Sequence, residues 1–599
     1  MNRILATFAS WATLSLVQAA NGDLLGARWL NRTLGPDGPW NAISVMLGNG
    51  QDVTVYPGKM WESYFLGESY CQNTTVEGQP CYAQEAGAIY NESAGFGNTA
   101  DISFPAGASY TSNMVATGND GTRYIDNMYL GNVASVWADD QIENFDMVLM
   151  SNTRFQYPSG KQYPIFAGCL SFGAARSAAN QTFQTVPGQA IDAVNVSLLA
   201  GTLYRHERIG SETFGMHIGS ASPQHVPGSL YFGGYDQNRA VNTMLAVSMG
   251  DSYGKFSDAP LIDISINVVK GESPFPWSNK GGLLAAGNSS MEDRLSVDID
   301  PCFPYLNLPK STCDAIANEI PVTYSEDLGL YFWDTDSPDY VRIVKSPSVL
   351  QFTFINPDNN KQPINISVPF MHLNLTLEQP LVDQPTPYFP CNAVSNGNYA
   401  LGRAFLQDAF FGANLATGIY FLSQAPGPNI NGESLMTMSE DCTQLDTSHN
   451  DWEISWDETW EPIQAQVNQT SQTPQTPPSD SPKRNTATAT IAGAAVGGVA
   501  GAIFLVLFGF IIWRHQRSGQ GFSLCGLPLI KDKSAVYRNT NVMGTDEPKS
   551  LTGYSARGPP QELSAYAGYQ LAEMPTSTVV HEMSPDYSGR SFILEEYSS

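Results

Sequence analysis

Residues 296–309 read SVDIDPCFPYLNLP, and the interpretation of the whole chain starts from this stretch. The apolar residues Val297 and Ile299 favour a short strand that ends at Asp300. A Leu-Pro step then leads into STCDAIA at residues 311–317, which has the composition of a helix start. We therefore predict a strand, a turn that begins at Asp300, and a helix.

Short strands separated by turn residues are the pattern of residues 40–425. Gly, Asn, Asp and Pro recur between apolar runs such as SVML at 44–47, DMVLM at 146–150 and LIDISI at 261–266. This pattern is typical of an all-β fold. A region of roughly 385 residues is too long for one simple sandwich, so we expect two β lobes.

Further landmarks resemble those of pepsin-like aspartic proteases. They are PGSLYFGGYD at residues 227–236, YALGRAFL at 399–406 and IYF at 419–421, in the order found in that family. In the family, the last two landmarks are strands.

The resemblance covers an ectodomain at residues 20–426 and implies a bilobal double β-barrel. Its N-terminal lobe would span about 40–210 and its C-terminal lobe about 211–426.

In that family, one aspartate from each lobe shares a proton with the other, and together they polarise a water. The second aspartate would be Asp300, the one catalytic candidate that this chain retains. Here PCFP at residues 301–304 replaces the small residues that orient the carboxylate. Asp298 is the weaker substitute on the same strand face. A lone buried Asp is also typical of a hydrogen-bonded turn.

The first catalytic turn of the family should lie within LGNGQDVTVYPGKMW, residues 47–61. Its aspartate position falls on Pro57-Gly58, where there is no carboxylate. Asp52 and Glu62 are the nearest acids. Either could be recruited only by a register shift, and an odd-numbered shift would turn the apolar side chains to the wrong face. The sequence therefore predicts that the first aspartate is missing.

Two other features of the family, the flap and the basic prosegment, have no clear counterpart in this chain. The flap would fall near SYT at 109–111 or GTRY at 121–124, and neither matches well. Residues 20–43 leave little room for the basic prosegment of an active zymogen. Both observations favour a protein without peptidase activity.

Two apolar segments predict a single-pass membrane protein at the plasma membrane or cell surface. Residues 1–19 have the basic start, apolar middle and small-residue end of a signal peptide. Residues 491–513 carry no charge and would span roughly 35 Å as a helix, enough for a hydrocarbon core of about 30 Å. Arg514 and Arg517 follow directly, which places the N-terminal side outside and residues 514–599 in the cytosol as a disordered tail.

The predicted span contains glycines four residues apart, a spacing that lets two helices approach closely. A dimer through this face is one expectation, and ordinary glycine content of a span is the other; the residues are Gly493, Gly497 and Gly501.

Candidate N-glycosylation sites agree with this orientation. All Asn-x-Ser/Thr triplets precede the span and none is in the tail. They begin at Asn31, Asn73, Asn91, Asn180, Asn195, Asn288, Asn365, Asn374 and Asn468.

Seven of the eight cysteines lie on the outer side, where disulfides persist. The resemblance favours the pairs Cys71–Cys81 and Cys313–Cys391, although sequence alone does not fix connectivity. The pairing of Cys169, Cys302 and Cys442 stays open, and an odd number implies a free thiol or an intermolecular bond.

An acidic extension at residues 427–463 follows the two lobes. Trp452, Trp456 and Trp460 are four residues apart, which fits either a helical face for a partner or a local cover over the ectodomain. Residues 464–490, rich in Gln, Thr, Ser and Pro, form a stalk.

The net charge of −27 argues against nucleic-acid binding, which needs basic patches. We expect no cofactor and no metal. The leading hypothesis is an inactive pepsin-like surface protein that binds a protein, peptide or glycan in the lobe cleft. An active aspartic endopeptidase that processes secreted or wall proteins, as in fungi, is the first alternative. A structural surface glycoprotein is the second.

Overall fold

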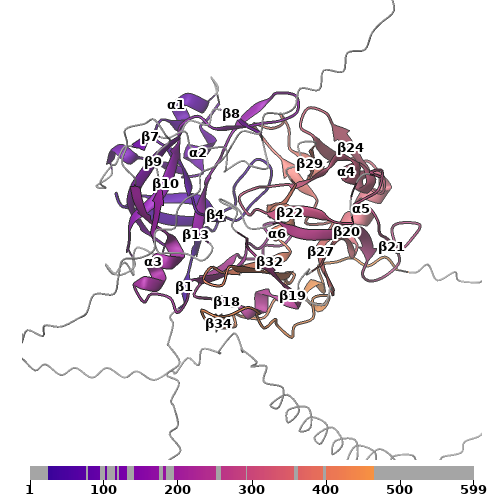
Figure 1. The fold of residues 1–599 in the computed structure, drawn as a ribbon. Helices are drawn as coiled ribbons and strands as arrows, with labels where there is room; N and C mark the ends of the chain where they lie inside the picture. The colour runs from indigo at the N-terminus through magenta and orange to yellow at the C-terminus, as the bar shows by residue number, and fades with distance from the viewer. Residues whose placement is uncertain are drawn as a thin grey trace, which may run out of the picture. The chain divides into compact units, whose positions relative to one another are not determined.

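The computed structural model describes residues 24–75, 79–94, 102–103, 115–117, 121–130, 141–174, 180–183, 194–250, 258–289, 291, 293–355, 362–394 and 399–464. Far more of these residues lie in strands than in helices, which confirms the all-β prediction (Figure 1). The predicted signal peptide at 1–19, the predicted span at 491–513 and the predicted tail at 514–599 lie outside them. Among the described helices, none is long and apolar enough to cross a membrane.

Residues 28–197 supply an eleven-stranded sheet within the described part of the chain. Every residue of β3 is buried, as is the second half of β10, because such continuous apolar runs suit strands covered on both faces. The strands predicted at 44–47 and 146–150 are thereby confirmed. The strands are β2 (Arg28–Trp29), β3 (Ile43–Leu47), β4 (Asp52–Met60), β5 (Tyr64–Gly67), β6 (Ile89–Tyr90), β7 (Ile102–Ser103), β9 (Gly121–Tyr129), β10 (Gln141–Met150), β13 (Gly168–Gly173), β14 (Asn180–Phe183) and β15 (Val194–Ser197).

A second large sheet has eight strands, counted over the described residues 259–401. It contains the strand predicted at 261–266. Its members are β20 (Ala259–Val268), β21 (Asn279–Lys280), β22 (Leu295–Ile299), β23 (Leu306–Pro309), β26 (Ser348–Ile355), β27 (Pro363–Pro369), β30 (Cys391–Val394) and β31 (Ala400–Leu401).

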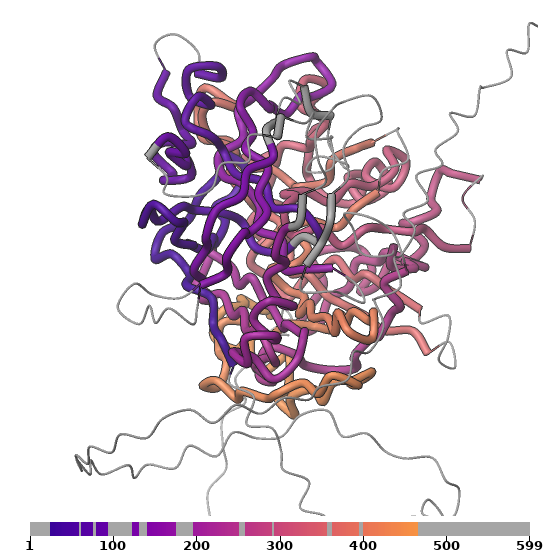
Figure 2. The backbone as a smooth tube through the Cα atoms, turned by 60° about the vertical axis from the view of Figure 1, so that its left-hand side comes forward, coloured from indigo at the N-terminus to yellow at the C-terminus, as the bar shows by residue number. Residues whose placement is uncertain are grey.

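A six-stranded sheet combines strands from the start, middle and end of the described chain. Its order is β1-β17-β16-β32-β33-β19. Figure 2 shows the indigo N-terminal segment reaching the side of the molecule where the orange C-terminal strands lie. The strands are β1 (Leu25–Gly26), β16 (Thr213–His217), β17 (Ser229–Phe232), β19 (Val241–Ser248), β32 (Ala409–Asn414) and β33 (Ile419–Gln424).

Smaller sheets lie around these three. They are formed by β8 (Val115–Thr117), β11 (Arg154–Gln156) and β12 (Gln162–Pro164); by β18 (Gly234–Asp236) and β34 (Leu435–Thr437); and by β24 (Val322–Ser325), β25 (Leu330–Trp333), β28 (Leu375–Leu377) and β29 (Thr386–Phe389).

The described helices are short. In α5, Ser337 caps the first turn by accepting a hydrogen bond from Asp339 N, and Pro338 occupies the first position, where its missing N–H costs nothing. The helix predicted at 311–317 is confirmed as α4. The helices are α1 (Tyr70–Thr74), α2 (Tyr82–Glu85), α3 (Leu199–Arg205), α4 (Lys310–Ala317), α5 (Pro338–Lys345) and α6 (Arg403–Leu406).

The same three-strand arrangement occurs in both large sheets. In the first, β13 runs parallel to β4 and antiparallel to β5. In the second, β31 runs parallel to β22 and antiparallel to β23. Each arrangement therefore has a turn between its two outer strands and a third strand that lies between them.

The prediction of a strand over residues 399–406 is wrong for the second half of that range. Only Ala400–Leu401 is strand, and Gly402 leads directly into α6. The backbone N–H groups of Gly402 and Arg403 donate to the carbonyls of Tyr305 and Phe303 instead of extending the ladder. The landmark at 419–421 is confirmed as a strand within β33.

The tryptophan-rich extension packs onto the body of the fold. Trp456 is fully buried, stacks on Trp460 with ring centroids 5.2 Å apart, and contacts His372 edge-on at 5.0 Å. The segment is a 3-10 turn (Ile454–Trp456) and not an extended helical face. This confirms the local cover and disfavours the tryptophans as a partner surface.

Candidate functional site

Asp300 follows β22 directly and is 5 % exposed. Its Oδ1 accepts a hydrogen bond from Cys302 N at 2.9 Å, and its carbonyl oxygen accepts one from Phe303 N at 3.1 Å. Its own N–H donates to the carbonyl of Leu401 at 3.2 Å. Asp300 thus fixes the turn that the sequence predicted at this position, using part of its carboxylate to do so.

The turn after β22 contacts β4, and the turn expected at Pro57-Gly58 is wrong in its position, because both residues lie within that strand. The sulfur of Cys302 lies 3.6 Å from the carbonyl oxygen of Gly58. Gly58 has a φ of 97°, and a Cβ atom at that residue would lie 2.5 Å from Cγ of Pro301. The position of the first expected carboxylate therefore holds a glycine with no room for any side chain.

A disulfide between Cys169 of β13 and Cys302 joins the first large sheet to the turn after β22, with Cα atoms 5.9 Å apart. Sequence reasoning left this pairing open. The two disulfides favoured from the sequence, Cys71–Cys81 and Cys313–Cys391, are confirmed. Cys442 is fully buried beside Tyr235 and Phe410.

Arg403, at the start of α6, lies under the same turn and is 3 % exposed. Its guanidinium donates to the carbonyl oxygen of Cys302 at 2.8 Å. The guanidinium carbon is 3.8 Å from the ring centroid of Tyr56 and 5.2 Å from that of Trp40. The aromatic faces and the carbonyl offset part of the cost of burying the charge.

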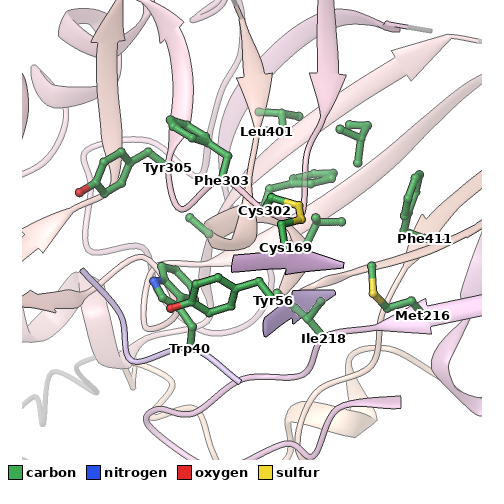
Figure 3. Close-up of a cluster of buried hydrophobic side chains, with 14 of the residues drawn as sticks. Trp40, Tyr56, Cys169, Met216, Ile218, Cys302, Phe303, Tyr305, Leu401 and Phe411 are labelled. Atoms are coloured by element: carbon green, nitrogen blue, oxygen red, sulfur yellow. A yellow bond between two sulfur atoms is a disulfide. The ribbon is translucent and has the colours of Figure 1, made fainter. Parts of the chain in front are cut away.

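Asp37 is a buried carboxyl group near Arg403. Burial raises the pKa of Asp37, while the positive charge of Arg403 and the hydrogen bond from Trp40 lower it. Trp40 Nε1 donates to Asp37 Oδ1 at 2.7 Å. Figure 3 shows Trp40 and Tyr56 on one side of the Cys169–Cys302 bond, and Phe303 and Tyr305 on the other.

Aromatic side chains fill most of the remaining space. The hydroxyls of Tyr305 and Tyr157 are 2.9 Å apart, and the rings of Phe303 and Tyr305 meet edge to face at 5.7 Å. A cavity of about 20 Å³ remains beside Asp37, Tyr56 and Arg403. That volume accommodates about one water molecule.

The other candidate acids are engaged elsewhere. Asp52, at the start of β4, pairs with Arg28 at 2.8 Å. Glu62 pairs with Arg123 and accepts a hydrogen bond from Tyr64 Oη at 2.9 Å. Asp298 is buried within β22, and its N–H donates to the carbonyl of Tyr399. None of these contacts brings a second carboxylate to Asp300.

Arg123 also contacts Asp146 of β10, and both side chains are 2 % exposed. Burial raises the pKa of Asp146 to about 7 against the attraction of Arg123, with the charge of Glu62 adding to the rise. Residues 121–124, one of the two flap predictions, therefore begin a packed strand. Residues 109–111 lie outside the described residues.

Sequence reasoning missed Asp37, Cys169 and Arg403 as parts of this site. Arg403 stood within the YALGRAFL landmark, and a cation inside an apolar motif is the signal that could have drawn attention to it. The described residues contain no group of three or more His, Cys, Asp or Glu side chains that could hold a metal ion.

The predicted glycosylation sites are partly described. Asn31, Asn73, Asn91 and Asn365 are exposed, and Asn288 and Asn374 are half-buried. The side chains of Asn180 and Asn195, and the whole of Asn468, lie outside what the structure describes.

Comparison with known proteins does not identify the chain. No protein-family model matches it. A search of curated proteins found no significant match.

Proposed function

We propose that this chain is a catalytically inactive pepsin-like protein, anchored in the plasma membrane through residues 491–513, that binds a ligand at the cell surface. The repeated three-strand arrangement, with the turn after β22 in contact with β4, supports the bilobal pepsin-like part of the proposal. The signal sequence, the apolar span and the one-sided triplets support the topology.

The single observation that carries the proposal is the contact of Gly58 with Pro301 and Cys302. Aspartic proteolysis needs two carboxylates close enough to share one proton. Gly58 replaces one of them, and Pro301 fills the space beside it. The other, Asp300, is bound to Cys302 N, and the disulfide of Cys302 lies where this turn contacts Gly58 of β4. A nucleophilic water would lack its base there.

Ligand binding would use a surface away from the filled contact between Gly58, Pro301 and Cys302. A half-polar pocket of about 110 Å³ lies next to the Cys71–Cys81 disulfide. Tyr82, Gln79 and Gln162 are among its lining residues. Tyrosine faces and amide groups suit a peptide or a sugar, since both offer hydrogen bonds and apolar surface.

The proposal is tested by incubating the detergent-solubilised full-length protein with a mixed peptide library from pH 3 to pH 8. Asp300→Ala serves as the comparison. We expect no cleavage by either protein. Cleavage that Asp300→Ala abolishes would instead establish the active endopeptidase.

The binding part is tested separately, by crosslinking at the cell surface with Tyr82→Ala as the matched variant. A partner that the wild type enriches and the variant loses supports binding through the pocket. Failure to enrich any partner favours the structural glycoprotein.

A further inference from the structure

Strand β27 is one end of the eight-stranded sheet, and within the described residues it pairs along one side only, with β26. The other side of an end strand offers unpaired N–H and C=O groups to any second strand. In an antiparallel pair these groups alternate, so that every second residue points its backbone away from the partner strand.

Ser367 shows which residues of β27 point outward. Its N–H donates to Gln424 Oε1 at 2.7 Å, and its C=O accepts from Gln424 Nε2 at 3.0 Å. Because both groups bind a side chain of β33, they do not face β26. By alternation, Pro363, Asn365 and Pro369 belong to the same outward-facing set.

Three of the four outward positions offer no N–H group to a second strand. Proline has no N–H to donate, which is why it is tolerated at sheet edges, and it stands at both ends of β27. Gln424 occupies both backbone groups of Ser367. Asn365 is the outward position whose backbone N–H is neither absent, as in proline, nor bound by Gln424.

Asn365 begins the triplet Asn365-Ile366-Ser367, and its side chain is exposed. Its Oδ1 accepts a hydrogen bond from Thr353 Oγ1 of β26 at 3.0 Å. This bond uses the amide oxygen and orients the side chain, leaving the nitrogen, which is the atom that carries an N-linked sugar.

We propose that Asn365 carries an N-linked oligosaccharide that covers the open backbone position of β27 and prevents edge-to-edge pairing with a second copy of this chain. The inference rests on the outside location in the proposed function and does not depend on the lack of proteolysis. A hydrated oligosaccharide blocks the approach of a strand in the same way as a charged side chain at a sheet edge.

Occupancy is measured by glycopeptide mass spectrometry of the full-length protein from a eukaryotic secretory host. We expect Asn365 to be modified in most molecules. An unmodified Asn365 overturns the inference. If Asn31 and Asn91 are modified at the same time, the outside location stands; if no triplet is modified, the location fails as well.

The role of the sugar is tested with Asn365→Gln, Asn365→Lys and the matched control Asn31→Gln, by size-exclusion chromatography with light scattering in detergent. We expect a several-fold larger oligomer fraction for Asn365→Gln, and none for Asn31→Gln. Asn365→Lys also lacks the sugar and the Thr353 bond, but its charge should restore the wild-type profile. An Asn365→Gln profile equal to wild type, or oligomers in both Asn365 variants, would show that edge protection is not the role.

Discussion

Pro301 occupies the space beside Gly58, so that a Cβ atom on residue 58 would lie 2.5 Å from Cγ of Pro301. The pyrrolidine ring is rigid, and Pro301 is bracketed by Asp300 and the disulfide-bonded Cys302. Neither side of this contact can yield without moving the turn.

Restoring a carboxylate by Gly58→Asp should therefore not restore proteolysis. We expect no peptide cleavage and a loss of about 2 to 4 kcal/mol in the free energy of unfolding, from the clash and from the left-handed φ of residue 58. Gly50→Asp is the matched control, because Gly50 also has a positive φ but nothing within 4 Å of its Cβ position. Denaturant unfolding that gives equal losses for both would contradict a steric origin.

Removing the disulfide at the junction should cost more stability than removing the one in the Cys71–Cys81 loop. The two bonds close 133 and 10 residues of sequence, and chain entropy alone makes the longer loop worth about 2 kcal/mol more. The comparison pairs Cys169→Ala/Cys302→Ala with Cys71→Ala/Cys81→Ala in chemical denaturation. Equal denaturation midpoints for the two double variants would argue that the Cys169–Cys302 disulfide does not constrain the unfolded chain more than the Cys71–Cys81 disulfide does.

The folded state should lose stability as the pH rises from about 4 to about 7. Burial raises the pKa of Asp146 from its ordinary value of 3.8 to about 7, so Asp146 holds its proton more tightly in the folded chain over that range. Stability falls with pH wherever the folded state binds more protons. Asp146→Asn should reduce this fall by on the order of 2 kcal/mol. Urea midpoints at pH 4.5 and 7 measure the effect, with the exposed Asp339→Asn as the control.

Trp456→Ala should be among the most destabilising changes outside the sheets, by about 3 to 5 kcal/mol, because the side chain is fully buried against His372 and Trp460. Ile454→Ala, two residues away and 62 % exposed, should stay within about 0.5 kcal/mol. Thermal unfolding of the two variants distinguishes them. Similar melting temperatures would mean that the extension does not contribute to the fold.

Apolar runs made the sheets predictable. The strands expected at 44–47, 146–150 and 261–266 all formed, because short apolar runs bounded by turn residues favour strands. The turn after residue 299 and the helix after it were also expected, since a strand that ends at Asp and a Leu-Pro step are local signals. The strand expected over 399–406 failed because Gly402 and Arg403 bind the distant turn at 303–305.

The candidate site depends on contacts that sequence spacing does not encode. Cys302 and Cys169 are 133 residues apart, and three cysteines were equivalent on spacing alone. Arg403 and Asp37 come from opposite ends of the described chain. They are buried near one another because the rings of Trp40 and Tyr56 lie against the Arg403 guanidinium, and Trp40 also donates a hydrogen bond to Asp37. Local patterns cannot reveal a buried charge whose partners are long-range.

The six-stranded sheet also has a consequence for folding during synthesis of the chain. It begins with Leu25–Gly26 and ends with Ile419–Gln424, so its hydrogen bonds cannot be completed until the polypeptide has emerged from the ribosome past residue 424. The edge of β16 that later receives β32 remains unpaired until Ala409–Asn414 has been synthesised. During that interval the edge is open to pairing with other strands, so a factor that covers it would protect the nascent chain from aggregation.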